Sequence, residues 1–415
     1  MHTLCAIHRD ELCRSIGHPM ADARPGILPR KRYDMSSTQQ RLISLDAFRG
    51  ATIAGMILVN NPGTWSDIYP QLRHAAWHGW TFTDFIFPFF LWIVGVAMTL
   101  SFARRVKEGA NKPQLLMHVL RRAAVIFGLG LFLNGFPFGL VSTHDFSWAG
   151  IRIPGVLQRI AICYLIASTI FLYTDVRGQI LWIIGLLASY WLAVTLIPVP
   201  GFGAGVLEPN GNLCWYIDSH LLSGHTWRGA PVPGFDPEGI FSTIPAIGTT
   251  LLGVLTGHWL RTDHSREVKT AWMFVAGNFL LLLGAILDMW LPINKNLWTS
   301  SYAIFMAGWA NVCLAMFYWL VDVQGYKKWA TPFVIYGMNA ITVFVLSGLV
   351  ARTMSLIQWT SAEGARMDVK SWIFQNVFAP LASPMNASLL FAIAFISVMF
   401  IVVWFMWKRK WFLKV

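Results

Sequence analysis

Four polar side chains beside the first two apolar runs have the types and spacing that proton transfer requires. His74 lies between Asn60–Asn61 and Asp84, in a stretch that separates two hydrophobic runs. Histidine has an ordinary pKa close to neutrality, so His74 is a candidate general base or nucleophile. Asp84 can orient an imidazole, and an asparagine amide can orient a carbonyl or stabilise a developing oxyanion. We predict that His74, Asp84 and one of the two asparagines form a catalytic group.

Each of these residues also has a structural explanation. Asparagine commonly closes helices, so one of Asn60 and Asn61 is expected to cap the first helix, which leaves the other free. Asp84 would cap the start of the second helix. His74 and His78 have the spacing of a metal pair on a helix, but no third ligand is evident and a glycine follows directly. We therefore expect no metal site.

Charged and amide groups recur at later apolar runs, where burial is costly and a functional role is the default hypothesis. Asp46 and Arg49 are three residues apart on one helical face, so they can pair with each other or contact a substrate. Arg159, beside Gln158 at the start of an apolar run, needs a counter-charge or a bound anion. Further candidates near helix ends are Asp236, Glu238, Lys295 and Asn339.

The composition indicates what must position these groups. The chain has 415 residues, of which 55% are hydrophobic and 13% charged, against about 25% charged in typical soluble proteins. Its long apolar stretches predict an all-α, polytopic integral membrane helix bundle. The formal net charge of +12 comes mostly from short loops, so nucleic-acid binding is not expected. The five cysteines form no C-x-x-C pair and predict neither a metal site nor a disulfide framework.

A membrane-crossing helix needs about 20 mostly apolar residues, and about ten segments meet this requirement. They are residues 43–61, 81–103, 116–136, 154–173, 179–198, 239–260, 270–290, 300–321, 331–351 and 387–407. We place them in one transmembrane domain at 41–415. Residues 1–40 are polar and lack the apolar run of a signal peptide. We expect that stretch to be a disordered cytoplasmic tail, or Met35 to be the true start.

The basic residues of the loops predict the orientation of the helices. Fourteen lie in the even-numbered connections and the C-terminal tail: Arg104, Arg105, Lys107, Lys112, Arg177, Arg261, Arg266, Lys269, Lys327, Lys328, Lys408, Arg409, Lys410 and Lys414. Seven lie in the odd-numbered connections: Arg73, Arg152, Arg228, Lys295, Arg352, Arg366 and Lys370. The richer side is cytoplasmic by the positive-inside rule, so both termini are expected inside and His74 near the outer face.

Several strings of the chain, in this order, resemble the catalytic domain of the heparan-α-glucosaminide N-acetyltransferase family and its bacterial homologues. They are Arg41-Leu-Ile-Ser-Leu-Asp-Ala-Phe-Arg-Gly50, Val59-Asn60, His74-Ala75 with Trp77 and Gly79, Asp84 with Phe87-Pro88, Arg152-Ile-Pro-Gly-Val-Leu-Gln-Arg159, Asp236-Pro-Glu-Gly-Ile240, Asn294-Lys-Asn-Leu-Trp298 and Gly337-Met-Asn339. The resemblance runs from residue 41 to the C-terminus, and the string ending at Arg159 is highly specific.

The resemblance implies an enzyme that takes acetyl-CoA from the cytosol, as a co-substrate, and acetylates the amine of an amino sugar on the far side. It assigns the family's catalytic histidine to His74 and the neighbouring asparagine to Asn60. It also implies a homo-oligomer. The lysosomal member carries a large luminal domain and another helix before this region. We therefore expect a bacterial inner-membrane member that acts on free glucosamine or on an amino sugar from cell-wall turnover.

Acetyl-CoA is expected in a tunnel through the bundle, with its phosphates near arginines at the cytoplasmic mouth. The candidates for binding it are Arg49, Arg104, Arg105, Arg121, Arg122, Gln158 and Arg159, and those for the acceptor are Trp77, Asp236, Glu238, Lys295 and Asn339. Arg121 and Arg122 have a simpler explanation as positive-inside anchors. Tryptophans such as Trp77 can be interfacial anchors instead of platforms for sugar rings.

Two other functions fit the same features. A secondary transporter of amino sugars would explain the helices and the polar groups among them, although no internal repeat is evident. An O-acyltransferase of an envelope glycan would keep the fold and change the acceptor. For acetyl transfer, we favour direct attack by the amine with His74 as general base over an acetyl-histidine intermediate, because the sequence shows nothing that obviously activates a histidine nucleophile.

Overall fold

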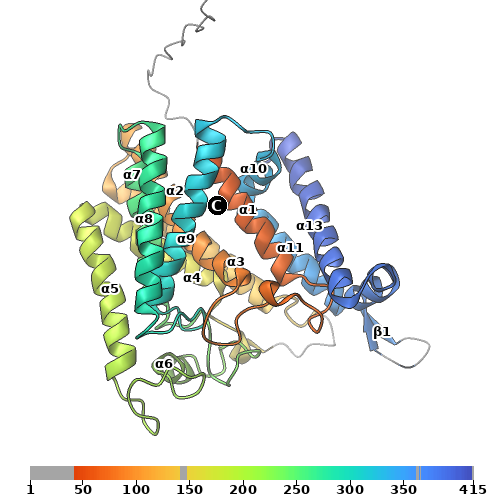
Figure 1. Ribbon diagram of the computed structural model, residues 1–415. Coiled ribbons are helices and arrows are strands. Elements are labelled where there is room, and N and C mark those ends of the chain that lie inside the picture. Colours follow the sequence, from red (N-terminus) through yellow and green to blue (C-terminus); the bar gives the residue numbers. More distant parts are fainter. Residues whose placement is uncertain (1–41, 141–146, 361–363, 365, 414–415) are drawn as a thin grey trace, which may run out of the picture. The chain divides into compact units, whose positions relative to one another are not determined.

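The computed structural model describes residues 42–140, 147–360, 364 and 366–413, which belong to one compact unit. The expected N-terminal extension at 1–40 lies outside the described residues. The described chain is mainly helical (Figure 1). Its sheet is a short antiparallel pair, β1 (Gln358–Thr360) and β2 (Arg366–Asp368), with Trp359 opposite Met367.

The long helices follow the apolar runs of the sequence. They are α1 (Ile43–Asn60), α2 (Ile86–Lys107), α3 (Lys112–Gly135), α4 (Val156–Tyr173), α5 (Val176–Leu196), α7 (Thr243–Leu260), α8 (Arg266–Leu287), α9 (Ser300–Tyr318), α11 (Ala340–Leu356) and α13 (Pro384–Lys408). The shorter ones are η1 (Pro70–Leu72), η2 (Phe82–Phe85), η3 (Trp148–Gly150), α6 (Leu213–Leu221), η4 (Trp319–Val323), α10 (Thr331–Met338), α12 (Val369–Ile373), η5 (Phe374–Phe378) and η6 (Ala379–Leu381).

The described chain has close to the expected number of membrane-crossing helices. All ten expected segments are helical, but eight helices of the described chain are long and apolar enough to cross a membrane, or nine if one bent pair counts as a single span. The expected segment at 239–260 became α7, which is outside this set. Four threonines and His258 lower its hydropathy, and most of its residues are buried against other helices.

The expected helix at 331–351 is also not continuous. It consists of α10 and α11, which meet at Asn339 with a bend of 81°. Neither proline nor glycine occupies the break itself, and the hydropathy is continuous through the run. The sequence therefore gave no sign of the bend. The break turns α11 across α1 and α3, where its far half lines a cavity.

The helices divide into a buried group and a peripheral group. In α1, α2 and α9, 61% of the apolar window is buried inside the protein, whereas in α8 the share is 22%. The outer faces of the peripheral helices carry large apolar side chains, including Leu181, Phe279 and Ile401. Such faces need an apolar solvent, so the chain is an integral membrane protein whose outer helices face lipid.

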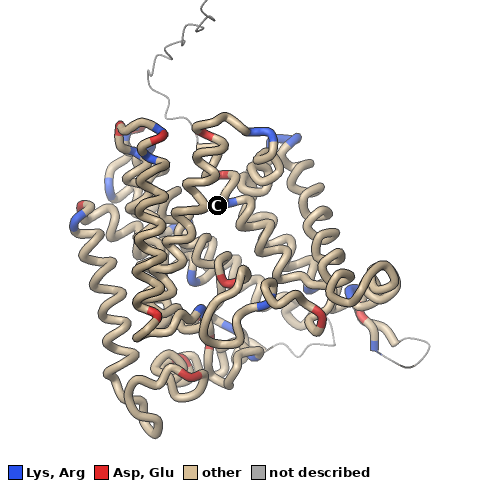
Figure 2. The backbone as a smooth tube through the Cα atoms, in the orientation of Figure 1, with Lys and Arg blue, Asp and Glu red and all other residues tan. Residues whose placement is uncertain are grey.

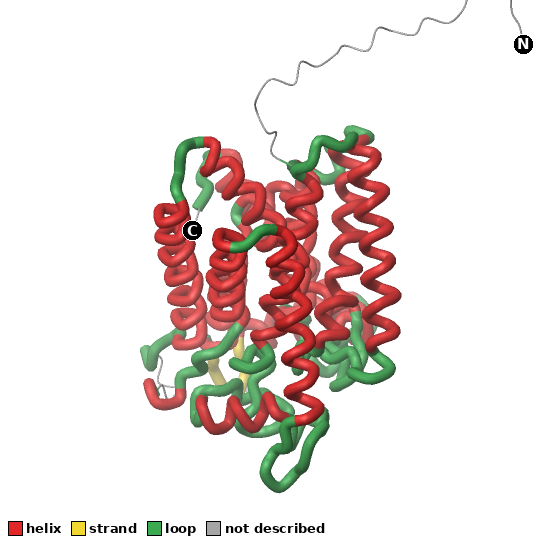
Figure 3. Tube along the Cα trace, turned by 90° about the vertical axis from the view of Figure 1, so that its left-hand side faces the viewer, coloured by secondary structure: helices red, strands yellow, loops and turns green. Residues whose placement is uncertain are grey.

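The helix ends collect at two opposite ends of the bundle. We call the first end the basic end. It contains the starts of α1 and α8, where the backbone N–H of Ser44 donates to Asp322 and Arg266 donates to the carbonyl of Asp322. At the other, the loop end, Gly79 N donates to Ile293 O and Gly63 N to Ser388 O. Figure 3 shows the long loops gathered at the lower, loop end, and Figure 2 shows Lys and Arg at the upper helix ends and again among the lower loops.

Close backbone contact joins α1 to α10, the helix before the break. A methyl group at Gly337 would overlap the carbonyl oxygen of Asp46, and one at Gly50 would overlap the carbonyl oxygen of Phe333. Small residues at such crossings let helix backbones approach closely in membranes. These two glycines therefore allow α10 to pack directly against the backbone of α1 just before the break at Asn339.

We predict that Gly337→Ala destabilises the protein by about 1–3 kcal/mol, because backbone atoms cannot move aside as a flexible side chain can. The matched control is Gly185→Ala in α5, where an added methyl group meets no atom within 4 Å. Thermal unfolding of both variants in detergent measures the difference. A Gly337→Ala protein as stable as the control would contradict the close crossing.

Candidate active site

His74 and Asp84 form a hydrogen-bonded pair at the start of α2. The Nδ1 atom of His74 lies 2.6 Å from Asp84 Oδ1, and Asp84 is 2% exposed. The second carboxylate oxygen accepts the backbone N–H groups of Ala75 (3.1 Å) and Thr81 (3.0 Å) and the Thr81 hydroxyl (3.2 Å). Thr81 and Asp84 also form a capping box, so one carboxylate both starts the helix and orients the imidazole.

This arrangement leaves the outer ring nitrogen of His74 available for chemistry. When Nδ1–H donates to Asp84, Nε2 carries the lone pair and can accept a proton. About half of the His74 side chain (49%) is exposed, so a substrate can reach it. A buried carboxylate behind the ring stabilises the imidazolium that forms when the base is protonated.

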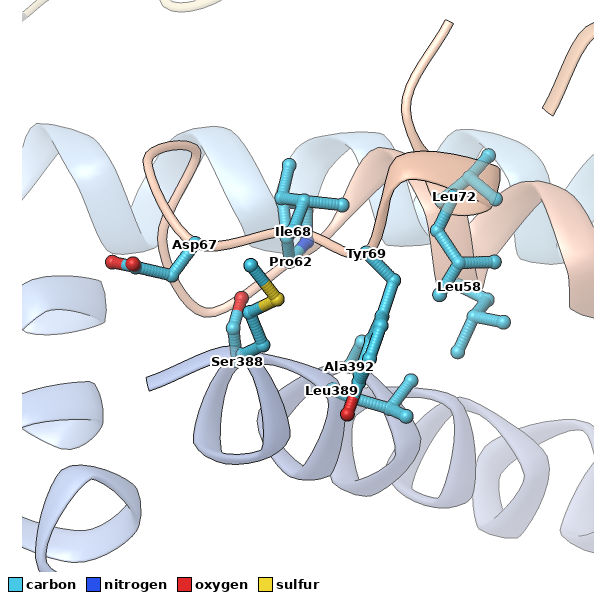
Figure 4. Close-up of a pocket in the computed structure, with 11 residues that line it drawn as sticks. Leu58, Pro62, Asp67, Ile68, Tyr69, Leu72, Ser388, Leu389 and Ala392 are labelled. Atoms are coloured by element: carbon cyan, nitrogen blue, oxygen red, sulfur yellow. The ribbon is translucent and has the colours of Figure 1, made fainter. Parts of the chain in front are cut away.

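The chain on both sides of His74 is held in place. The carbonyl of Arg73 accepts the hydroxyl of Thr81 at 2.6 Å. Further back, Gly63 and Thr64 bond to Ser388 of α13, and the Tyr69 hydroxyl donates to Asn386 at 2.5 Å. Figure 4 shows the hollow of about 20 Å³ between this segment and α13, which has room for about one water molecule. The loop that carries His74 is therefore a packed part of the structure.

The two adjacent asparagines at the end of α1 differ in their surroundings. Asn61 is buried, and its amide donates to Ile57 O at 2.9 Å, one turn back. Asn60 lines a cavity of about 380 Å³ between α1, α3, α4 and α11. Asn61 is therefore the residue that closes the helix, and Asn60 is the exposed one of the two residues at the cavity.

Polar groups are concentrated in the lining of this cavity. Besides Asn60 and Asn61, they are Asn134, Arg152, Gln158, Ser347 and Arg352. Asn134 donates to the carbonyls of Arg152 and Pro154, which fixes the chain that enters α4. The volume falls in the range of about 300–1,000 Å³ that is typical of small-molecule sites.

Gln158 and Arg159 are neighbours with different surroundings. Gln158 lines the cavity, and its buried Nε2 atom has no hydrogen-bond partner among the described residues. Arg159 is 1% exposed, donates to Gly239 O and to the Ser242 hydroxyl, and stacks 5.2 Å from the ring of Trp298. Arg159 therefore joins α4 to the start of α7.

A group of paired charges lies at the loop end beside α4. The guanidinium of Arg152 bonds both oxygens of Asp236 (2.8 and 2.6 Å) and Glu238 (2.5 Å), and Lys295 lies 3.9 Å from Glu238. Burial disfavours the Glu238 carboxylate, but Lys295, Arg152 and Arg159 outweigh burial and lower its pKa to about 2. Burial likewise opposes the charge of Arg152, yet its two carboxylates raise its pKa.

The other residues expected at the acceptor lie in two places. Trp77 belongs to the loop end, where its indole N–H donates to Leu207 O and its ring packs against Phe235. Asn339 occupies the break between α10 and α11. Its amide donates to Trp411 O and accepts from Leu413 N, which are in the segment after α13. None of these bonds joins Asn339 to the group around Lys295.

Of the arginines expected at acetyl-CoA, Arg104 and Arg105 lie in the last turn of α2, and Arg121 and Arg122 lie in the first half of α3, near its middle. Arg105, Arg121 and Arg122 act electrostatically on the same residue, His118, and Arg122 also lies 5.1 Å from the ring of Tyr164. Arg104 is exposed and 3.7 Å from Glu108. Arg49 stands apart from them, 3.2 Å from Asp46 and 3.4 Å from Gly337 O.

Three cavity or site residues were not singled out from the sequence. Thr81 shares the Asp84 carboxylate, and the signal for it was the Thr-Phe-Thr-Asp spacing of a capping box. Arg352 was counted as a loop residue because the expected helix ended one position earlier, whereas α11 continues to Leu356. Asn134 had no signal beyond being an amide near the end of an apolar run.

Comparison with known proteins identifies the family. The model of the family described as heparan-alpha-glucosaminide N-acetyltransferase, catalytic, matches residues 41–293. The chain is 30% identical over 393 residues to the heparan-alpha-glucosaminide N-acetyltransferase of Mus musculus and 31% identical over 389 residues to that of Homo sapiens. The alignments cover 83% and 81% of this chain. The chain belongs to the heparan-alpha-glucosaminide N-acetyltransferase family.

This membership confirms the resemblance drawn from the sequence strings. The alignments cover 58% and 57% of the mouse and human relatives, so the chain spans less than two thirds of their length. The match to the heparan-alpha-glucosaminide N-acetyltransferase family model includes α1, the His74 loop, α4 and Arg152 with Asp236 and Glu238, and it ends two residues before Lys295.

A buried carboxyl group lies behind the paired charges. Asp218 of α6 is fully buried; its Oδ1 accepts the N–H of Ile240 at 2.9 Å, and its Oδ2 has no partner among the described residues. Burial raises the pKa of Asp218 to about 7, and the nearby Asp236 acts in the same direction. The group is therefore partly protonated near neutral pH.

We predict that Asp218→Asn stabilises the protein increasingly as the pH rises from 5 to 8. Between its unfolded pKa of 3.8 and about 7, the folded state binds more protons than the unfolded state, so the native protein loses stability as pH rises. An asparagine keeps the bond to Ile240 and removes this loss. We expect a melting temperature about 2–4 °C above that of the native protein at pH 8 and a smaller gain at pH 5.

The control for this prediction is Asp263→Asn, an exposed carboxylate in the loop after α7. That substitution should leave the pH dependence of the melting temperature unchanged. A constant difference between Asp218→Asn and the native protein at all pH values would mean that Asp218 titrates at an ordinary pKa.

Proposed function

We propose that the chain is a transmembrane N-acetyltransferase, which moves acetyl from cytosolic acetyl-CoA to the amine of glucosamine or a related amino sugar on the opposite side. The observation that carries the proposal is the His74–Asp84 pair, a half-exposed base with a buried carboxylate behind it. Family membership supports the reaction class, because the mouse and human relatives are named as N-acetyltransferases.

The pair provides the proton transfers that the reaction needs. The sugar amine attacks the thioester carbonyl carbon, a C–N bond forms, and His74 Nε2 takes the proton that the amine loses. The C–S bond then breaks, and the proton passes from His74 to the departing CoA thiolate. Asp84 stabilises the imidazolium between these steps, and the Asn60 amide stabilises the negative charge that develops on the carbonyl oxygen.

The basic end suits the donor. Arg104, Arg105, Arg121 and Arg122 would attract the CoA phosphates there. From Arg122 to Gly130, where the cavity begins on α3, is eight residues, or about 12 Å of helix rise. An extended pantetheine arm along α3 and α4 would bring the acetyl group to Asn60. Gln158 would then contact the arm, while Arg159 and Arg49 would support the walls around it.

The loop end suits the acceptor. Trp77, Asp236, Glu238 and Lys295 lie there, on the side that the positive-inside rule makes external. We place both termini in the cytoplasm, the protein in a bacterial inner membrane, and the active form in a homo-oligomer. Asn339, at the break before α11, is better placed to hold the C-terminal segment than to touch the sugar.

The first test uses the purified protein in sealed vesicles, with labelled acetyl-CoA on one side and glucosamine on the other. We expect N-acetylglucosamine on the sugar side and a loss of at least about 100-fold in His74→Ala, because the general base is removed. His220→Ala is the control, since His220 is exposed on α6 and bonds locally to Tyr216. Unchanged sugar crossing the membrane without acetyl-CoA would instead indicate a transporter.

A second test distinguishes direct transfer from an acetyl-histidine intermediate. We expect direct transfer, so protein incubated with labelled acetyl-CoA and no sugar should retain no covalent label after rapid quenching at a pH that preserves acyl-imidazoles. The presence of Asp84 behind the ring makes this test necessary, because a carboxylate can also activate a nucleophilic histidine. Label bound to the native protein and absent from His74→Ala would overturn the direct route.

A further inference from the structure

One cation in the cavity has no part in the proposed reaction. Arg352 lies near the end of α11 and lines the cavity between α1, α3, α4 and α11. Within the described ranges of the chain, it has no ion pair and no hydrogen bond. A charged side chain in a membrane helix is costly, and such residues normally pair with a counter-charge or serve a ligand.

The surrounding charges do not neutralise Arg352. Its electrostatic neighbour is another cation, Arg152. The carboxylates of Asp236 and Glu238 are both bonded to Arg152, and Glu238 also faces Lys295. Arg152, Arg159 and Lys295 already act on these carboxylates, so Arg352 adds a positive charge beside the cavity that neither carboxylate pairs with. The C-terminal end of α11 favours a nearby cation, but it does not occupy the guanidinium donors.

Gln158 adds a second polar side chain to the wall of the same cavity. The residue is 2% exposed, and its Nε2 has no acceptor among the described residues. This Nε2 atom is itself closed off by its neighbours, so Arg352 is the cation of the wall that remains to meet a ligand.

We propose that Arg352 binds a carboxylate on the acceptor, so that the protein prefers amino sugars that carry an acidic substituent over neutral glucosamine. The inference rests on the proposed function, because it places the acceptor in the cavity that Asn60 lines. The amine of glucosamine is cationic when protonated, and the unneutralised charge of Arg352 repels it. A carboxylate on the same sugar removes that repulsion and gives the guanidinium a bidentate partner.

The acidic group would enter from the loop end. Arg352 lies in the second half of α11, away from the break at Asn339 and close to β1 in the chain. It acts electrostatically on Arg152, which is bonded to the loop residues Asp236 and Glu238. The CoA phosphates would bind at the other end, near Arg121 and Arg122. The two anionic groups therefore have separate cationic sites.

The test compares 2-amino-2-deoxyglucuronate, which has a carboxylate at C6, with glucosamine as acceptors for the native protein and for Arg352→Gln. We expect the native protein to have the lower KM for the acidic sugar, and Arg352→Gln to reduce the ratio of the two kcat/KM values by at least about 10-fold. Arg352→Lys should restore part of it. Arg228→Gln, an exposed loop-end arginine, is the matched control and should leave the ratio unchanged.

Two outcomes would overturn the inference and leave acetyl transfer intact. One is an equal loss with both sugars, which would mean that Arg352 acts structurally. The other is a raised KM for acetyl-CoA, which would mean that Arg352 binds the donor. Direct binding separates this inference from the proposed function: calorimetry without acetyl-CoA should show 2-amino-2-deoxyglucuronate binding to the native protein and at least about 10-fold weaker binding to Arg352→Gln, even if no transfer is detected.

Discussion

A charge placed among apolar helices must be matched by another charge or by enough hydrogen bonds, and this constraint organises the loop end of the protein. Arg152 satisfies this constraint by donating hydrogen bonds to both Asp236 and Glu238. Arg159 satisfies it only in part: Nη2 donates to a carbonyl and a hydroxyl and the guanidinium faces Trp298, but the buried Nε and Nη1 have no partner among the described residues. Asp84 accepts four hydrogen bonds, one of them shared with the imidazole of His74. Arg352 has neither an ion pair nor a hydrogen bond among the described residues, and it lines the cavity.

The sequence predicts the helices well because a helix that crosses lipid must be apolar over about 20 residues. Each apolar run of about 20 residues became helical. The bend at Asn339 was not predictable in the same way, because hydropathy is continuous through residues 331–351 while the bend depends on the contact between α1 and α10. The length of α11 was underestimated for a related reason. Arg352 ends the apolar run in the sequence, but α11 continues past it because its charged side chain lines the cavity.

The candidate site was only partly predictable. His74 and Asp84 are ten residues apart, and a capping position near a loop histidine was enough to suggest the pair. Arg152 and Asp236 are 84 residues apart, and no single sequence shows that they bond. Gln158 and Arg159 were expected to share one role. Successive residues of a helix point about 100° apart, so Gln158 reaches the cavity while Arg159 reaches α7.

The His74 loop and the cavity are parts of one continuous set of contacts. Gly79, five residues after His74, bonds to Ile293, and Lys295 follows two residues later and faces Glu238. Glu238 bonds Arg152, whose carbonyl is fixed by Asn134 on the cavity wall. The base and the cavity are therefore positioned by the same network of buried charges, although they come from different helices. A protein that must bring a donor from one end and an acceptor from the other needs such a shared support, because a shift of about 1 Å in either group is enough to lose a productive geometry.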